Sequence, residues 1–86
     1  MPTISRFFGI VISMYVDEHG RPHFHATYAE HHASIDIESN EILEGRLPAR
    51  QTRLVRRWAS LHRDALLTNW RLARAGKPLI EIAPLS

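Results

Sequence analysis

The stretch Ala33-Ser-Ile-Asp-Ile-Glu38 decides the fold, because its apolar and polar side chains alternate residue by residue. In an extended strand Ile35 and Ile37 then point to one face, and the acidic residues point to the other. This pattern is typical of an antiparallel sheet that packs one face on a core and turns the other to water. Ser39-Asn40 predicts a two-residue loop, because asparagine tolerates the positive φ of a tight hairpin turn.

Outward from this stretch, further segments have the composition of strands. Residues 10–16 are β-branched and apolar, and they predict a buried strand. Residues 23–29 predict the next strand, after a connection that contains Gly20 and Pro22. The other predicted parts of this region are a polar connection at 30–32 and a returning strand at 41–47. Together these segments predict a three- to four-stranded antiparallel meander. Residues 3–8 are a candidate for an additional short edge strand.

A helix is predicted to follow the meander. Residues 49–75 contain neither glycine nor proline, and Pro48 suits the first turn of a helix. Gly76, with a proline shortly after it, stops the run. At 100° per residue the first half carries an apolar stripe with arginines on the opposite side. The stripe consists of Leu54, Trp58, Leu61 and Ala65.

The apolar face rotates beyond residue 65, where Leu66 and Trp70 no longer align with the first stripe. Either the helix breaks near Arg63 with Asp64 as a new N-cap, or one long helix is covered on different sides along its length. We favour one helix, kinked or continuous. Residues 79–82 predict a short closing strand, so the predicted fold class is α+β: a meander, a long helix and a C-terminal strand.

Composition limits the class of protein. With 86 residues, 44% of them hydrophobic and 23% charged, the chain is expected to form a single globular domain, 1–86. The absence of cysteine excludes a disulfide scaffold, a thiolate zinc site and a cysteine nucleophile. No apolar run approaches the length of a membrane span and no signal pattern opens the sequence, so a cytoplasmic location is expected. We recognise no cofactor-binding motif.

Charge is distributed unevenly along the chain. Residues 1–45 carry two arginines and seven acidic residues, whereas residues 46–77 carry eight arginines and one lysine against a single aspartate. Arg50, Arg53 and Arg57 lie on one side of the predicted helix and are candidates to bind RNA phosphates or a small acidic partner protein. Alternatively, the two halves neutralise one another within the fold. Trp58 and Trp70 would stack on bases only if exposed, and tryptophans at helical spacing more often belong to a core.

His23 and His25 are the second group of candidates, because residues i and i+2 of a strand point to the same face. Two imidazoles so placed can act as a general acid and base on one substrate group. They could instead hold a metal ion, but only if the fold supplied a third ligand. The residues considered for that role are Asp17, His19, His32, Asp36 and His62. The simplest alternative is two surface imidazoles bonded to neighbouring backbone.

Several segments resemble one family over essentially the whole chain. They are Met1-Pro-Thr-Ile-Ser-Arg-Phe-Phe-Gly-Ile, the R-P-H-F-H-A run at 21–26, Ala33-Ser-Ile-Asp-Ile-Glu, Glu44-Gly-Arg-Leu-Pro, the L-H-R-D-A-L-L-T-N-W run at 61–70 and Leu72-Ala-Arg-Ala-Gly76. In this order they resemble the small bacterial proteins classed as domain-of-unknown-function family 4160. The typical segment of that family is P-P-H-F-H, and Arg21 replaces its first proline here.

The resemblance implies one member of a two-gene, toxin–antitoxin-like module, encoded beside another small protein. It assigns no catalytic residue. Combined with the residues, it gives our first hypothesis, a protein that binds or cleaves RNA with His23 and His25 as acid and base and the helix arginines on phosphate. The alternatives are a non-catalytic module that binds an acidic partner and a small metalloprotein. A homodimer is a further candidate assembly.

Overall fold

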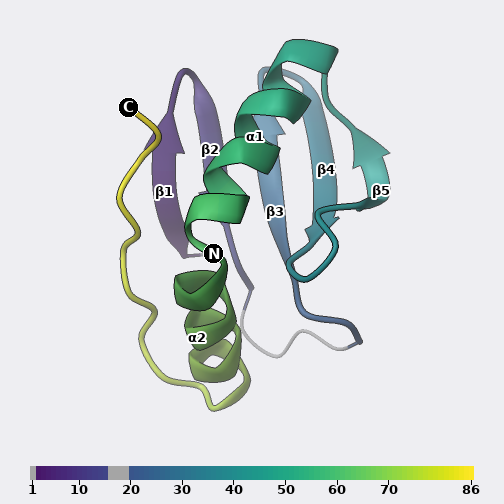
Figure 1. Cartoon of the computed structure of the whole chain (residues 1–86). Helices are drawn as coiled ribbons and strands as arrows, with labels where there is room; N and C mark the ends of the chain where they lie inside the picture. The colour runs from purple at the N-terminus through teal and green to yellow at the C-terminus, as the bar shows by residue number, and fades with distance from the viewer. Residues whose placement is uncertain (1, 16–19) are drawn as a thin grey trace.

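The computed structural model describes residues 2–15 and 20–86, and its frame is one five-stranded antiparallel sheet. Each strand pairs with the next along the chain, so the order is β1-β2-β3-β4-β5 (Figure 1). The strands are β1 Thr3–Phe7, β2 Ile10–Ser13, β3 His23–Tyr28, β4 His31–Asp36 and β5 Ile42–Arg46. The α+β class and the meander are therefore confirmed. The sheet has five strands where the meander was predicted to have three to four, and β1 corresponds to the candidate edge strand at 3–8.

Alternation sorts the sheet into two faces. Phe24 and Ala26 of β3 are fully buried, as are Ile10 and Ile12 of β2. Helix α1, Ala49–Leu61, covers this apolar face and crosses in front of the sheet in Figure 1. The ring of Trp58 lies against the core, with its centroid 5.8 Å from that of Phe24. The opposite face carries polar residues, and it includes both candidate histidines.

The helical region is two helices, not one. Helix α1 ends at Leu61 and α2, Arg63–Arg74, begins after His62, whose φ of −121° and ψ of 26° are not helical. The N-cap is thus His62, and Asp64 lies in the first turn of α2. Our preference for one helix was wrong. Leu61, predicted in the apolar stripe, is 66% exposed, because the chain turns away from the core at this point.

Several strand boundaries also differ from the prediction. Strand β4 begins at His31, so the residues expected to form a polar connection at 30–32 are largely paired in the sheet. The turn before β4 is tighter, and Ala29 occupies it with a φ of +52°. Strand β2 ends at Ser13, whereas its predicted end at residue 16 lies outside the described residues. The two-residue loop predicted at Ser39-Asn40 is wrong, because β4 ends at Asp36 and β5 begins only at Ile42. The positive φ expected at Asn40 is confirmed at +63°.

The predicted closing strand at 79–82 is absent. This segment runs beside β1 (Figure 1), but its one described backbone bond to β1 is from Ile82 N–H to the carbonyl of Ile4. Side chains hold it instead. Asn69 donates to the Ile80 carbonyl and accepts from the Ile80 N–H, and Trp58 Nε1 donates to the Ala83 carbonyl. Prolines flank the segment and lack the N–H that a ladder needs, which explains why no strand forms.

The end of α2 agrees with the prediction that Gly76 stops the helix. Gly76 has a φ of +70°, its N–H bonds to the Ala73 carbonyl, and the next N–H bonds to the Leu72 carbonyl. These two bonds form a Schellman cap, which satisfies carbonyls that the helix end leaves unpaired. Within residues 2–15 and 20–86, neither helix is long and apolar enough to cross a membrane.

Candidate functional site: an imidazole cluster on the polar sheet face

His23 and His25 share one face of β3, as their spacing predicts. His23 pairs with Asp36 and His25 with Ser34 on β4, whereas Phe24 between them points into the core. The two ring centroids lie 5.2 Å apart. The sheet therefore brings two imidazoles close enough to contact one substrate group from adjacent positions.

His25 lies at the centre of a larger cluster. Its Nδ1 is 3.2 Å from Nε2 of His32 and 3.3 Å from Oγ of Ser34. The ring of His32 stacks on it at 5.3 Å, and the ring of Tyr15 meets its edge at 4.4 Å. His25 is only 9% exposed, and these side chains pack around its ring.

Two contacts with described residues hold His23 at the beginning of β3. Its Nδ1 donates to the Arg21 carbonyl at 2.8 Å, which fixes the tautomer of the neutral ring and leaves the lone pair on Nε2. Trp70 of α2 packs against the ring, with centroids 5.0 Å apart. The second helix thus positions His23, although its tryptophan is 5% exposed and belongs to the core.

Arg21 lies beside His23 and forms an ion pair with Asp36. Its Nη2 lies 2.7 Å from Oδ2 of Asp36, a fully buried carboxylate, although no N–H is aligned on that oxygen. Oδ1 of Asp36 accepts from the backbone N–H groups of Glu38 and Ser39. Burial by itself raises the pKa of the Asp36 carboxyl, but these N–H groups and Arg21 outweigh it and hold the pKa below its ordinary value.

A shallow cleft opens next to these residues. It has a volume of about 290 Å³ and is lined by Arg21, His23, Ser34, Leu43 and Glu44. One cation, one imidazole, one hydroxyl and one carboxylate thus face the same space. The guanidinium is well placed for an anion, since the side chain of Arg21 is 65% exposed.

The helix arginines are not part of this cluster. Arg50, Arg53 and Arg57 are all exposed on α1, which covers the apolar face of the sheet. His23 and His25 lie on the other face, so the sheet separates the two candidate groups. One phosphate cannot contact both groups directly. Trp58 and Trp70 are 0% and 5% exposed, and neither is available to stack on a base.

The described residues contain no group of three or more histidine, aspartate or glutamate side chains placed to hold a metal ion. Of the third ligands considered, His32 reaches His25, and Asp36 is engaged by Arg21 and two backbone N–H groups. His62 contacts Trp58 on the helix side of the sheet. Asp17 and His19 lie outside the described residues.

The sequence analysis did not assign Arg21, Tyr15 or Ser34 to the cluster. Ser34 could have been found from the alternation, because residues 34 and 36 share a face of β4. The place of His32 could be found only from the register of β3 against β4, which pairs His32 with Thr27 and so places it diagonally across from His25. No local signal shows that Arg21 turns back toward Asp36.

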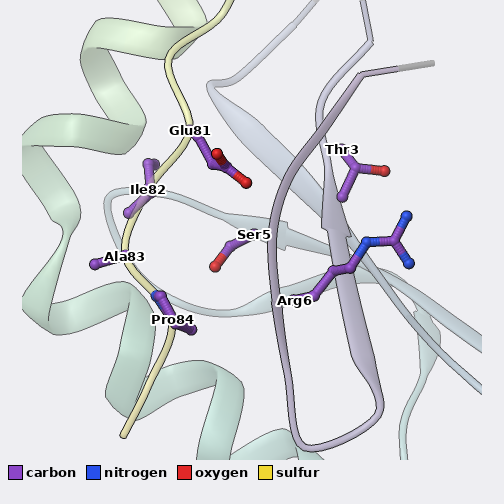
Figure 2. A pocket seen from close by; sticks show the side chains of 7 residues that line it. All are labelled: Thr3, Ser5, Arg6, Glu81, Ile82, Ala83 and Pro84. Atoms are coloured by element: carbon purple, nitrogen blue, oxygen red, sulfur yellow. The ribbon is translucent and has the colours of Figure 1, made fainter.

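A second hollow of about 460 Å³ lies between β1 and the C-terminal segment. Figure 2 shows Ser5 and Glu81 pointing into it, with Arg6 on the far side of β1. Ser5 is buried, and its hydroxyl has no hydrogen-bond partner among the described residues. This hollow brings together no imidazole and is separate from the cluster around His25.

Comparison with known proteins gives one match. The family model described as "Domain of unknown function (DUF4160)" matches residues 9–71, which include the imidazole cluster, Arg21 and most of α2. No curated protein and no solved structure matches the chain.

Proposed function

The chain belongs to the family of the domain of unknown function DUF4160, and because that description assigns no activity, we propose a function from the site itself. We propose that the protein is the RNA-cleaving member of a two-protein, toxin–antitoxin-like module. The observation that carries the proposal is the pair of imidazoles of His23 and His25. Their ring centroids lie 5.2 Å apart, beside the exposed guanidinium of Arg21.

The reaction class follows from what these groups can do. Nε2 of His23 takes the proton of a ribose 2′-hydroxyl, because Nδ1 already donates to the Arg21 carbonyl. The 2′-oxygen then forms a bond to the adjacent phosphorus, and the bond from phosphorus to the 5′-oxygen breaks. His25, as an imidazolium, gives a proton to that departing oxygen. The products are a 2′,3′-cyclic phosphate and a 5′-hydroxyl.

Arg21 supplies the positive charge for this reaction, in place of the helix arginines considered at first. It lines the cleft next to His23, and its anchor on Asp36 limits how far it moves. A guanidinium offers two parallel donors to phosphate oxygens and stabilises charge that develops on them. Glu44, which lines the same cleft, accepts hydrogen bonds from the sugar or base and repels a phosphate from its own side.

The exposed arginines of α1 favour a second function of the same chain. Arg50, Arg53 and Arg57 form a positive surface on the layer that the chemistry does not use. We infer that this surface binds the acidic partner protein of the module through charge complementarity. The purely non-catalytic alternative keeps this surface and assigns the histidines no chemistry.

The test uses the purified chain and a single-stranded RNA labelled at its 5′ end. We expect cleavage that leaves 2′,3′-cyclic phosphate ends, continues in EDTA, and falls by about 10²- to 10⁴-fold in His23→Gln and in His25→Gln. The matched control is His31→Gln, because His31 pairs with Tyr28 and takes no part in the cluster. Cleavage that stops in EDTA would support the metal alternative. Absence of cleavage by the wild-type chain, or unchanged rates in both variants, would refute the proposal.

A further inference from the structure

Among the imidazoles of the cluster, His32 is exposed, His23 is half-buried and His25 is buried. Its ring stacks on that of His25 with an interplanar angle of 25°, and Nε2 of His32 lies 3.2 Å from Nδ1 of His25. His25 itself is 9% exposed, and Ser34, the other group near Nδ1, is buried as well. His32 therefore links the buried face of His25 to solvent.

A hydrogen bond between two imidazole nitrogens needs one donor and one acceptor. The contact between Nδ1 of His25 and Nε2 of His32 thus holds one proton, carried by either ring. When the two rings together carry one positive charge, the proton between them can belong to either ring without leaving the pair. A second positive charge is opposed, because two imidazolium rings would stack at 5.3 Å.

We infer that His25 and His32 form a proton-sharing pair in which His32 passes protons between water and His25. This role rests on the proposed function, in which His25 is the acid. Water gives a proton to Nδ1 of His32, and the proton on Nε2 of His32 moves to Nδ1 of His25. His25 then releases the proton on its own Nε2 to the departing 5′-oxygen. Transfer in the opposite direction returns both rings to their first tautomers.

His32 acts on the reaction only through His25, so it is a positioning residue. Among the described residues, two other titratable groups touch this part of the face: Tyr15, at the edge of the His25 ring, and His23, whose ring centroid lies 5.2 Å from that of His25. Arg21 forms an ion pair with Asp36 at the adjacent register position.

The first experiment does not depend on any activity. The imidazole ¹⁵N signals of the isotope-labelled protein are followed against pH in the wild type, His32→Gln and His31→Gln. We expect His25 and His32 to titrate in two shared steps in the wild type and in His31→Gln, and His25 to titrate in one step in His32→Gln. An identical titration of His25 in wild type and His32→Gln would overturn the inference.

The second experiment asks whether His32 carries protons or only packs on its neighbour. We expect His32→Ala to cleave RNA about ten- to a hundredfold more slowly, and added imidazole to restore much of the rate, because a small base can occupy the space left by the ring. A slow rate that imidazole does not restore would contradict the relay. If the wild type cleaves no RNA, the proposed function fails, and the titration alone decides whether the pair shares a proton.

Discussion

Asp36 shows at the scale of one residue how this protein places a charge. The carboxylate is fully buried, yet both of its oxygens face positive partners, two backbone N–H groups on one side and Arg21 on the other. A buried carboxylate stays ionised only with such partners. Asp36 therefore fixes the turn after β4 and the position of Arg21 at once.

The low pKa of Asp36 sets the sign of a pH effect. Because its pKa is lower in the folded than in the unfolded chain, Asp36 stabilises the fold above the unfolded value, about 3.9. This contribution disappears as the pH falls through the folded pKa. Asp36→Asn should lower the free energy of unfolding by about 1.5–3 kcal/mol at pH 7, the range for hydrogen bonds to charged groups.

Urea unfolding at pH 7 and at pH 3 measures both parts of this prediction. The difference between wild type and Asp36→Asn should shrink at the lower pH, because there the Asp36 carboxyl of the unfolded wild type is largely protonated and unfolding is favoured. Glu38→Gln serves as the control, since Glu38 is exposed and only its backbone N–H contacts Asp36. A difference that stays constant with pH would show that the carboxylate charge does not matter.

The residues that alternate in sequence were predictable, and the residues joined by long-range contacts were not. His23 and His25 share a face because β-strands have a period of two. The ion pair of Arg21 with Asp36 and the stacking of His32 on His25 depend on the register of β3 against β4. A single sequence contains the local pattern of each strand, but register is decided by the whole sheet.

At the scale of elements, Trp58 connects α1 to the sheet and to the C-terminal segment. Its ring is fully buried, lies 5.3 Å from the ring of Phe7 and 5.8 Å from that of Phe24, and its Nε1 donates to the Ala83 carbonyl. One side chain therefore packs the helix on the sheet and also fastens the C-terminal segment.

Trp58→Ala should lower the free energy of unfolding by about 3–5 kcal/mol, the usual range when a large aromatic is removed from a core. Trp58→Phe keeps much of the ring volume but loses the bond to Ala83, so it should cost less. Chemical denaturation monitored by far-UV circular dichroism measures both variants. Equal losses would mean that the hydrogen bond, and not the packing, is the main contribution.

The helical elements show why local periodicity was insufficient. The apolar face does rotate beyond residue 65, and the structure meets this rotation with a break at His62. Each helix then buries its own side, and Leu61 at the junction is left exposed. A rotation of the stripe fits both a break and a long helix covered on two sides. Only the packing against the sheet distinguishes them.

At the scale of the whole molecule, the sheet separates two charged or titratable surfaces. The imidazole cluster and Arg21 occupy one face, and α1 presents its arginines from the layer over the other face. If RNA is cleaved on the first surface and a partner protein binds the second, then changes on one surface should leave the function of the other intact. The order of the layers thus predicts two separable functions.

The triple variant Arg50→Gln, Arg53→Gln, Arg57→Gln tests this separation against His23→Gln. We expect the triple variant to lose binding to the proposed acidic partner protein and to keep its RNA cleavage, because α1 lies across the sheet from His23. His23→Gln should behave in the opposite way. Binding is measured by calorimetry and cleavage with the labelled RNA.

If α1 instead binds RNA, the triple variant should reduce the slope of log affinity against log salt by about two, for three lost phosphate contacts on a single strand. That result would place RNA on the helix layer and contradict the separation.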